Sequence, residues 1–336
     1  MWQLVNQTPY AAERCFARDR DGAELWVVAV KGTFDILTDG STRLSESQEE
    51  VCKVPRFHGS PGKSSLMYEG ELVPGKQATD VLVHGTARAP GGRPVTQLDV
   101  AMRVGPLTKV LRIFGERRWR KRIGLGLTPP EPFVGMPIVY EHAFGGVDTE
   151  ATPRTDTWER RNPIGTGFAS SPDRLVGQRA PCVEDPRFLI NTWTDRPPPA
   201  GFGPLCRDWS PRRERAGTYD AKWQQERQPL VPLDFDDRFH QCAPDDQQVP
   251  GYLRGGELVT LFNVGPHEEL RFALPRVWLV FSTRLGRQRV EHRARLHSVI
   301  IEPDAPRVMM VWATSVPCHN REHMLEQTTI REKQFI

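Results

Sequence analysis

A basic run interrupted by a single tryptophan carries the strongest chemical signal in this sequence. Residues 116–122 read ERRWRKR. On a strand the side chains alternate between two faces, so Arg118 and Arg120 would point away from Trp119. Arginine and tryptophan dominate the hot spots of protein interfaces, and basic residues beside a ring can also hold phosphate and stack a base. We therefore assign partner binding to Arg118, Trp119 and Arg120, with a charged, solvated edge strand as the plain structural alternative.

The remaining reactive side chains do not combine into a complete catalytic or metal site. GSPGKSS at 59–65 lacks the first glycine of a phosphate loop, since Phe57 stands at that position, and no G-x-S-x-G nucleophile elbow occurs. Cys318, His319 and His323 have a spacing that could supply zinc ligands, but no further CxxC or HxxxH pair completes the set. The sequence therefore predicts no catalytic residue, no metal and no cofactor.

A second candidate region runs from Arg196 to Pro244 and is rich in proline, glycine, aromatic and charged residues at once. Proline and glycine exclude a long regular element from its first half. Disordered segments are poor in rings because they have little to bury, so we expect an ordered, irregular belt whose rings pack into the fold. The residues assigned to this structural belt are Phe202, Trp209, Arg212, Tyr219, Asp220, Trp223, Asp234, Phe235 and Asp236.

The charges of the belt raise a choice between structure and catalysis. The carboxylates of DFDD at 234–237 could serve as acid and base, or hold a cation, but nothing supplies the other ligands of a calcium loop. Charges lying between buried rings must pair, because an unpaired buried charge is costly. We therefore expect ion pairs with Arg212, Arg213 or Arg238, and a loss of stability when Asp220 or Asp236 is neutralised.

Alternating and β-branched runs supply the elements that must position both regions. Such runs predict strands at 24–37, 79–88, 95–104, 107–114, 257–263, 269–281, 288–301 and 307–314. One short helix is predicted at 218–227 with Thr218 as its N-cap, and a terminal helix at 319–328.

These elements predict a mainly β fold with few short helices. We expect two β-rich lobes, each a sandwich or open-barrel-like assembly, joined by the long Pro/Gly/aromatic-rich belt. The N-terminal lobe would cover 1–130, the belt region 131–250 would pack on both lobes, and the C-terminal lobe with its short terminal helix would cover 251–336.

Length, composition and charge limit the classes to which the protein can belong. The chain has 336 residues, enough for a substantial core, and its 30 prolines and 28 glycines favour many turns. A formal net charge of +3 is too balanced to predict nucleic acid or an anionic membrane as the main partner. No apolar run could span a bilayer and the first residues lack the regions of a signal peptide, so we expect a cytoplasmic protein with six free thiols.

Several long phrases resemble those of a bacterial family known as domain of unknown function 2169. In the belt they are PPPAGFGP (197–204), WSPR (209–212), RAGTYDAKW (215–223) and PLDFDDRFHQCAP (232–244). Elsewhere they are NQTP (6–9), VKGTFDI (30–36), KQATDVLVHGTARAPGG (76–92), MPIVYEHAFGG (136–146) and RNPIGTGF (161–168). The resemblance extends from about Asn6 to Trp312, which makes the whole chain one family unit.

The resemblance implies a function that the residues alone do not. Members of that family are commonly encoded beside type VI secretion components. The chain would then be a non-enzymatic adaptor or chaperone that binds a secreted effector protein and helps to load it onto the VgrG–PAAR spike. Its partners would be the effector and a PAAR or VgrG spike component. Two alternatives stay open: an enzyme acting on a small molecule or glycan in a cleft between the lobes, and an immunity protein that neutralises a toxin.

Overall fold

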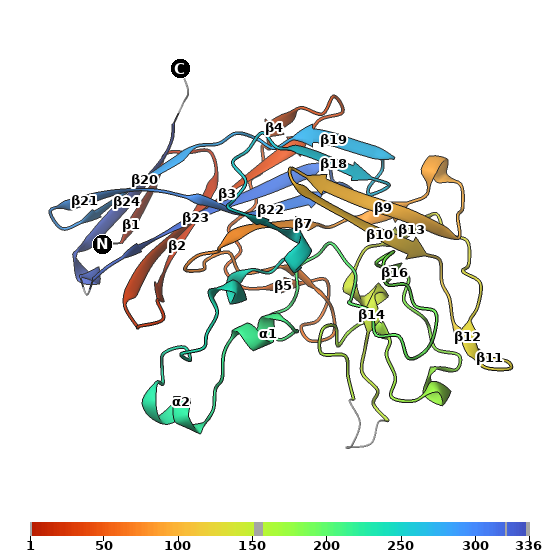
Figure 1. Ribbon diagram of the computed structural model, residues 1–336. Helices are drawn as coiled ribbons and strands as arrows, with labels where there is room; N and C mark the ends of the chain where they lie inside the picture. Colours follow the sequence, from red (N-terminus) through yellow and green to blue (C-terminus); the bar gives the residue numbers. More distant parts are fainter. Residues whose placement is uncertain (1, 151–156, 320, 334–336) are drawn as a thin grey trace.

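The computed structural model describes residues 2–150, 157–319 and 321–333 and consists mainly of β-strands. Its two α-helices in this part of the chain, α1 (Arg212–Arg215) and α2 (Ala221–Glu226), are short. The larger sheets lie along the upper part of the view in Figure 1, and irregular segments extend below them, carrying both helices and some short strands such as β11 (Trp119–Lys121), β12 (Leu125–Leu127) and β14 (Phe144–Gly145). The predicted mainly β class with few short helices is confirmed. Within the described ranges, no helix has the length and apolar character needed to cross a bilayer.

The largest sheet combines segments from both ends of the chain. Its order is β17 (Gln248–Pro250), β7 (Ala78–Val83), β22 (Arg295–Glu302), β23 (Arg307–Pro317), β3 (Glu24–Ile36) and β2 (Ala11–Arg18), and β4 (Thr42–Leu44) also pairs with β3. β7 and β22 run parallel, whereas the other neighbours are antiparallel. β3 is buried along nearly its whole length. A strand covered on both faces reads as a continuous apolar run, which explains its sequence ELWVVAVKGTFDI.

Two further sheets show the same mixing. The five-stranded sheet has the order β16 (Val183–Glu184), β10 (Leu107–Phe114), β9 (Gln97–Val104), β18 (Leu258–Phe262) and β19 (Glu269–Ala273). The four-stranded sheet has the order β1 (Gln3–Asn6), β24 (Leu325–Glu332), β20 (Leu279–Leu285) and β21 (Gln288–Arg293). Strands from the expected lobes 1–130 and 251–336 therefore pair in all three sheets. The lobes are interleaved, because strand pairing joins surfaces that can be distant in sequence.

Four two-stranded ribbons complete the regular structure of the described residues. They are β5 (Arg56–Phe57) with β6 (Leu66–Tyr68), β8 (Thr86–Arg88) with β13 (Gly135–Pro137), β11 (Trp119–Lys121) with β12 (Leu125–Leu127), and β14 (Phe144–Gly145) with β15 (Thr166–Gly167).

The main core lies between the seven-stranded and the five-stranded sheet, as in a sandwich. Val28 and Val30 of β3 share one buried cluster with Met102 of β9, Leu111 of β10 and Leu261 of β18. The opposite face of the large sheet is covered by loops. Residues of β7, β22 and β23 there pack with side chains of the belt and of the β6 region; this second cluster contains Cys52, Tyr68, Leu82, Cys242, Ala243, Ile300 and Met309. The belt thus covers a sheet face.

Two helix predictions had different outcomes. The predicted helix at 218–227 is present as α2, although Asp220 rather than Thr218 accepts the capping hydrogen bond. The predicted terminal helix at 319–328 is wrong. Leu325–Glu332 forms β24, which lies between β1 and β20, and only a short 3-10 turn at Glu322–Met324 precedes it. The β-branched residues of LEQTTIRE fit a pleated sheet, and pairing on both sides outweighed the local helix pattern.

Candidate functional site

The belt is ordered, and we name two of its parts: the anchor segment (residues 196–215) and the arm (residues 216–236), which the end of the belt (residues 237–244) follows. In the anchor segment, Phe202 and Trp209 are buried in the main core, with exposed fractions of 0% and 3%. The rings of Trp209 and Tyr140 meet edge to face at 5.6 Å. The carbonyl of Phe202 accepts a hydrogen bond from the backbone N–H of Val83 at 3.1 Å, which holds the segment at the end of β7.

Arg212 connects the anchor segment to the rest of the fold through a buried ion pair. Its Nη1 lies 2.7 Å from Oε2 of Glu69 and donates to the carbonyl of Leu205 at 2.6 Å. Nη2 donates to the carbonyl of Phe239 at 2.9 Å. Burial alone would raise the pKa of Glu69, but the guanidinium groups of Arg212 and Arg207 outweigh it and hold that pKa below its usual value. The pair is therefore charged at neutral pH. The bonds from Arg212 to the carbonyls of Leu205 and Phe239 hold two distant parts of the belt together.

A second buried ion pair, between Lys76 and Asp80, lies beneath the belt. Nζ of Lys76 is 2.5 Å from Oδ2 of Asp80 and 3.0 Å from Oγ of Ser298. The backbone N–H of Cys242 donates to Oδ2 of Asp80 at 2.9 Å, and the amide of Gln241 donates to Oδ1 at 2.8 Å. Asp80 belongs to β7 and Ser298 to β22, so the pair fastens the end of the belt to the large sheet.

Burial and pairing set the protonation states of these groups. Burial alone would lower the pKa of Lys76, but the carboxylate of Asp80 raises it overall. Burial raises the pKa of the Cys242 thiol to about 12 and lowers the pKa of His240 to about 4. At neutral pH the lysine is charged, the cysteine is a neutral thiol and the histidine is a weakly basic, neutral imidazole. These states suit a structural network better than nucleophilic or acid–base chemistry.

The arm carries α2 and projects away from the sheets (Figure 1). Its helix begins where the carboxylate of Asp220 accepts the backbone N–H of Trp223 at 2.8 Å. Trp223 packs edge to face on Tyr219 at 4.6 Å, and its indole N–H donates to the carbonyl of Leu230 at 2.8 Å. These contacts lie within the arm, so they give it a defined shape of its own.

The arm rests on the turn between β2 and β3. Arg227 donates to the carbonyl of Arg20, and Arg20 donates to the carbonyl of Phe235. Gly22 has a φ of +87°, and a methyl group at its Cα would lie 2.8 Å from Cδ2 of Leu230. This turn therefore needs glycine both for its backbone conformation and for the approach of the arm.

Large apolar side chains are exposed on the arm. Leu233 is 73% exposed and Tyr219 is 54% exposed. Thr218, Asp220, Trp223 and Leu233 are among the residues lining a groove of ≈ 310 Å³ on the arm itself. A larger groove of ≈ 540 Å³ separates the arm from the body of the molecule; its walls include Arg20, Lys76, Tyr219, Phe235, Phe239 and His240. Exposed rings and aliphatic side chains beside grooves are the features expected of a protein-binding surface.

The structure corrects the expected setting of the belt carboxylates. Asp220 is exposed and acts as a helix cap, and Asp234 is exposed and accepts hydrogen bonds from Thr218. Asp236 pairs with Arg238, as expected, with Oδ2 2.8 Å from Nε, but at the surface. Arg212 does not pair with any of these aspartates; its partner is Glu69, 143 positions away. The buried charge is at the base of the belt, because the arm that carries the aspartates leaves the body.

Trp119 lies in the interior, which corrects the expectation of an exposed anchor. Its exposed fraction is 2%, and it shares a hydrophobic cluster with Phe144, Leu175 and Ile190. The backbone N–H of Trp119 donates to the carbonyl of Gln178 at 3.0 Å. The side chains of the run do alternate between two faces, but the face that carries the Trp119 ring points into the interior. A ring with this burial packs the fold and cannot meet a partner at the surface.

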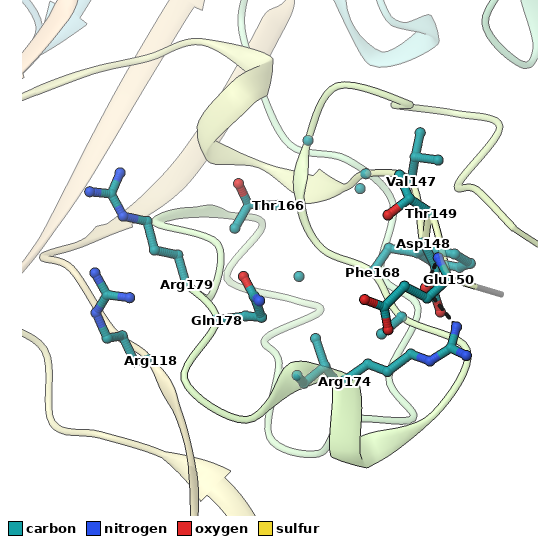
Figure 2. A pocket seen from close by; sticks show the side chains of 16 residues that line it. Arg118, Val147, Asp148, Thr149, Glu150, Thr166, Phe168, Arg174, Gln178 and Arg179 are labelled. Atoms are coloured by element: carbon teal, nitrogen blue, oxygen red, sulfur yellow. Dashed lines mark hydrogen bonds and ion pairs between the residues drawn. The ribbon is translucent and has the colours of Figure 1, made fainter.

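Arg118 lines a pocket of ≈ 580 Å³ next to that cluster (Figure 2). Arg118 and Arg179 lie together at one end of the pocket, and Arg174 lies toward the end that carries Asp148. Arg118 donates to the carbonyl of Gly177 at 2.9 Å, and Arg174 lies 2.8 Å from Asp148. Arg120 is exposed. Arg118 and Arg120 therefore remain at the surface, without the ring that was expected to accompany them, whereas Arg117 of the same run is buried and pairs with Glu184.

The cysteine and histidine residues near the C-terminus do not assemble a metal site in the described part of the chain. There, no group of three or more His, Cys, Asp or Glu side chains could hold a metal ion. Cys318 is buried, and its thiol contacts the carbonyl of Val316.

Sequence reasoning missed the residues on which the belt is held. Glu69, Lys76 and Asp80 were not singled out, although KQATD (76–80) opens one of the family-like phrases and places a cation and a carboxylate four positions apart. A lysine four positions before an aspartate, at the start of the strand 79–88, was the available signal. Its partner is a strand residue that points the same way, so the pairing becomes visible only in the fold.

Comparisons with known proteins give one positive finding. The family model DUF2169, described as an uncharacterized protein conserved in bacteria, matches residues 21–313. No curated protein and no solved structure matches this chain.

Proposed function

The chain belongs to the bacterial DUF2169 family, and from this membership we propose that it is a non-enzymatic adaptor or chaperone of a type VI secretion system. It would bind a secreted effector protein in the cytoplasm and help to load it onto the VgrG–PAAR spike. The secretion context comes from the resemblance of the sequence phrases to that family. The physical support comes from the arm.

The arm is the single observation that carries the proposal. It presents Tyr219 and Leu233 to solvent on a segment that leaves the body, beside grooves of ≈ 310 Å³ and ≈ 540 Å³. Large apolar side chains left exposed beside grooves are a feature of protein interaction sites. A tyrosine fixed against Trp223 offers a large contact area at little cost in conformational entropy.

The anchor segment makes this surface rigid. The Arg212–Glu69 pair closes the base of the belt, and Arg227 holds the arm on the turn before β3. A recognition element that is ordered before binding loses less entropy on association. The base of the belt therefore keeps the arm in one position, ready for a partner.

The larger groove favours binding over catalysis. His240 lines it with a pKa lowered to about 4 by burial, and the ammonium group of Lys76, another lining residue, is itself buried and paired with Asp80. A general base or acid works best with a pKa near the working pH. These two groups supply neither, so a partner's side chain is a better occupant of the groove than a reacting substrate.

Co-expression provides the test. The chain would be produced with the effector and the PAAR or VgrG protein encoded beside its gene, and the complexes would be separated by gel filtration. We expect the wild-type chain to co-elute with the effector. The double variant Tyr219→Ser/Leu233→Ser should lose the complex while keeping its melting temperature. Ile123→Ser is the matched control, because Ile123 is a fully exposed apolar side chain in the β11–β12 turn, away from the arm.

Three outcomes would contradict the proposal. If the arm variant still co-elutes with the effector, the arm is not part of the interface. If no effector or spike component encoded beside the gene binds the chain, and secretion persists after deletion of the gene, the proposed adaptor function is wrong. Stoichiometric inhibition of the effector's own activity, without an effect on its secretion, would point to an immunity protein instead.

A further inference from the structure

A separate basic and aromatic pocket lies where the four-stranded sheet meets the seven-stranded sheet. Its volume is ≈ 390 Å³. Three segments form its walls: the loop after β17 at 251–254, the start of β20 at 277–279 and the junction of β21 with β22 at 293–296. Trp312 of β23 completes the lining. Neither the arm nor the Arg118 pocket shares a residue with it.

Arg295 is held in position at the wall of this pocket. Its guanidinium lies 5.0 Å from the centre of the Tyr252 ring, and its Nη1 donates to the Tyr252 hydroxyl at 3.0 Å. That hydroxyl donates in turn to the backbone carbonyl of Lys76. Tyr252 has a φ of +74°, a conformation that non-glycine residues rarely adopt. The surrounding contacts hold the ring there, and the ring holds the guanidinium.

The positive charge of the pocket has no counter-charge in the described structure. Arg254, Arg293 and Arg295 line it, and none of its lining residues is acidic. Among residues 2–150, 157–319 and 321–333, none of these three guanidinium groups forms an ion pair. The nearest carboxylates in sequence are engaged elsewhere: Glu257 accepts the backbone N–H of Arg254 and Glu291 faces Arg289. Three like charges around one cavity favour an anionic ligand.

The floor of the pocket is apolar. Leu253, Val277, Leu279, Leu296 and Trp312 belong to the main core and show only a small part of their surface in the pocket. A bare phosphate or a nucleic-acid backbone would satisfy the arginines and leave this floor uncovered. An apolar or aromatic side chain flanked by carboxylates would match both parts at once, since planar guanidinium groups bind carboxylates through two parallel hydrogen bonds.

We propose that this pocket binds an acidic peptide segment with a large apolar side chain at its centre. The side chain enters over Leu253 and Trp312, and the flanking carboxylates meet Arg293, Arg295 and Arg254 at the rim. The pocket is distinct from the arm, so the proposal does not depend on the adaptor function and its test needs no effector.

Fluorescence anisotropy with synthetic peptides tests the proposal. The probe is a fluorescein-labelled peptide with one tryptophan between two pairs of glutamates, blocked at both ends. The reference peptide has glutamine in place of each glutamate. We expect the acidic peptide to bind the wild-type chain, and to bind the Arg293→Gln/Arg295→Gln variant about tenfold or more weakly, because charge-assisted hydrogen bonds are lost. Its affinity should also fall as salt is raised.

A matched double variant controls for net charge. Arg93→Gln/Arg287→Gln removes two exposed arginines outside the pocket and should leave peptide affinity unchanged. If both double variants lose the same amount of affinity for the acidic peptide, the pocket is not the binding site. Equal binding of the glutamine peptide would overturn the requirement for acid. Two further results would assign the pocket to a phosphate ligand and overturn the proposal. In one, inorganic phosphate displaces the labelled peptide at a lower concentration than unlabelled peptide does. In the other, a single-stranded oligonucleotide binds more tightly than the peptide.

Discussion

Arg212 in the anchor segment and Asp220 at the start of the arm lie close in one stretch of sequence, yet their charges meet opposite surroundings. Arg212 is 1% exposed and bonds to Glu69, whereas Asp220 is exposed and caps a short helix. Their neighbours in sequence are similar: prolines, rings and charges occur throughout 196–244. The two parts of the belt differ in what they are packed against.

The comparison shows what composition can and cannot predict. Rings in a Pro/Gly-rich stretch did predict order, and the belt is ordered in both parts. They did not predict burial, because a ring can pack within its own segment, as Trp223 does on Tyr219. A charge beside a ring is therefore costly to remove only where the body of the protein covers it.

Replacement of Arg212 should produce the largest loss of stability. Arg212→Met leaves Glu69 buried with one cation fewer and strips hydrogen bonds from the carbonyls of Leu205 and Phe239. Breaking a buried pair in this way typically costs about 3–5 kcal/mol in the free energy of unfolding. Arg207→Met is the control, because Arg207 also pairs with Glu69 at 2.9 Å but is half exposed and should cost about 1 kcal/mol or less. Urea unfolding measures both losses of stability; equal losses would contradict the difference in burial between the two arginines.

The same pair predicts a pH dependence. Because the folded pKa of Glu69 lies below its unfolded value near 4.5, its ionisation stabilises the fold above that pH. This contribution is lost as the pH falls through the folded pKa. The Arg212→Met variant lacks most of it from the start, so its deficit against the wild type should shrink as unfolding is measured from pH 7 down to about pH 4. A deficit that grows toward low pH would contradict the assignment of Glu69 as the partner.

Trp119 extends the comparison to the other basic and aromatic run. Trp119→Ala removes a ring from the cluster with Phe144 and Leu175, and such truncations cost about 3–5 kcal/mol. Arg120→Ala, one position away on the exposed face, should stay within about 0.5 kcal/mol. Thermal or urea unfolding of both variants gives the answer. If Trp119→Ala unfolds like the wild type, the ring is not part of the core.

Asp220 should show the modest effect of a helix cap. Asp220→Ala removes the acceptor for the backbone N–H of Trp223 and should cost about 1 kcal/mol. Asp220→Asn should be close to neutral, since asparagine caps helices as well as aspartate does. The two variants together separate capping from charge. A large loss in Asp220→Asn would mean that the charge itself is buried and would restore the original expectation for the belt.

The smallest effect on stability is expected at the tip of the arm. Tyr219→Ser/Leu233→Ser removes exposed apolar surface, and surface substitutions of this kind usually change the free energy of unfolding by about 0.5 kcal/mol or less per site. Its effect should instead be on partner binding. A clear fall in the melting temperature of the isolated variant would show that these side chains support the fold, and the contrast between the anchor segment and the arm would then disappear.

Several local elements could be predicted from the sequence alone. The alternating run at 107–114 became β10 over Leu107–Phe114, the continuous apolar run at 24–37 became β3, and the short helix in the belt is α2. Local order follows from side-chain period and backbone preference, and both can be read within a few residues. Proline and glycine content likewise predicted the scarcity of long helices.

The burial of individual side chains and the pairing of distant strands could not be predicted in this way, because they depend on the tertiary fold. Glu69 meets Arg212 across 143 positions, β24 lies between β1 and β20, and Trp119 faces inward although its neighbours face solvent. An alternating pattern predicts that the two faces of a strand differ. It does not predict which of the two faces another sheet or loop will cover. That choice depends on surfaces brought together from distant parts of the chain, and so does the separation of a buried anchor from an exposed arm within one stretch of similar composition.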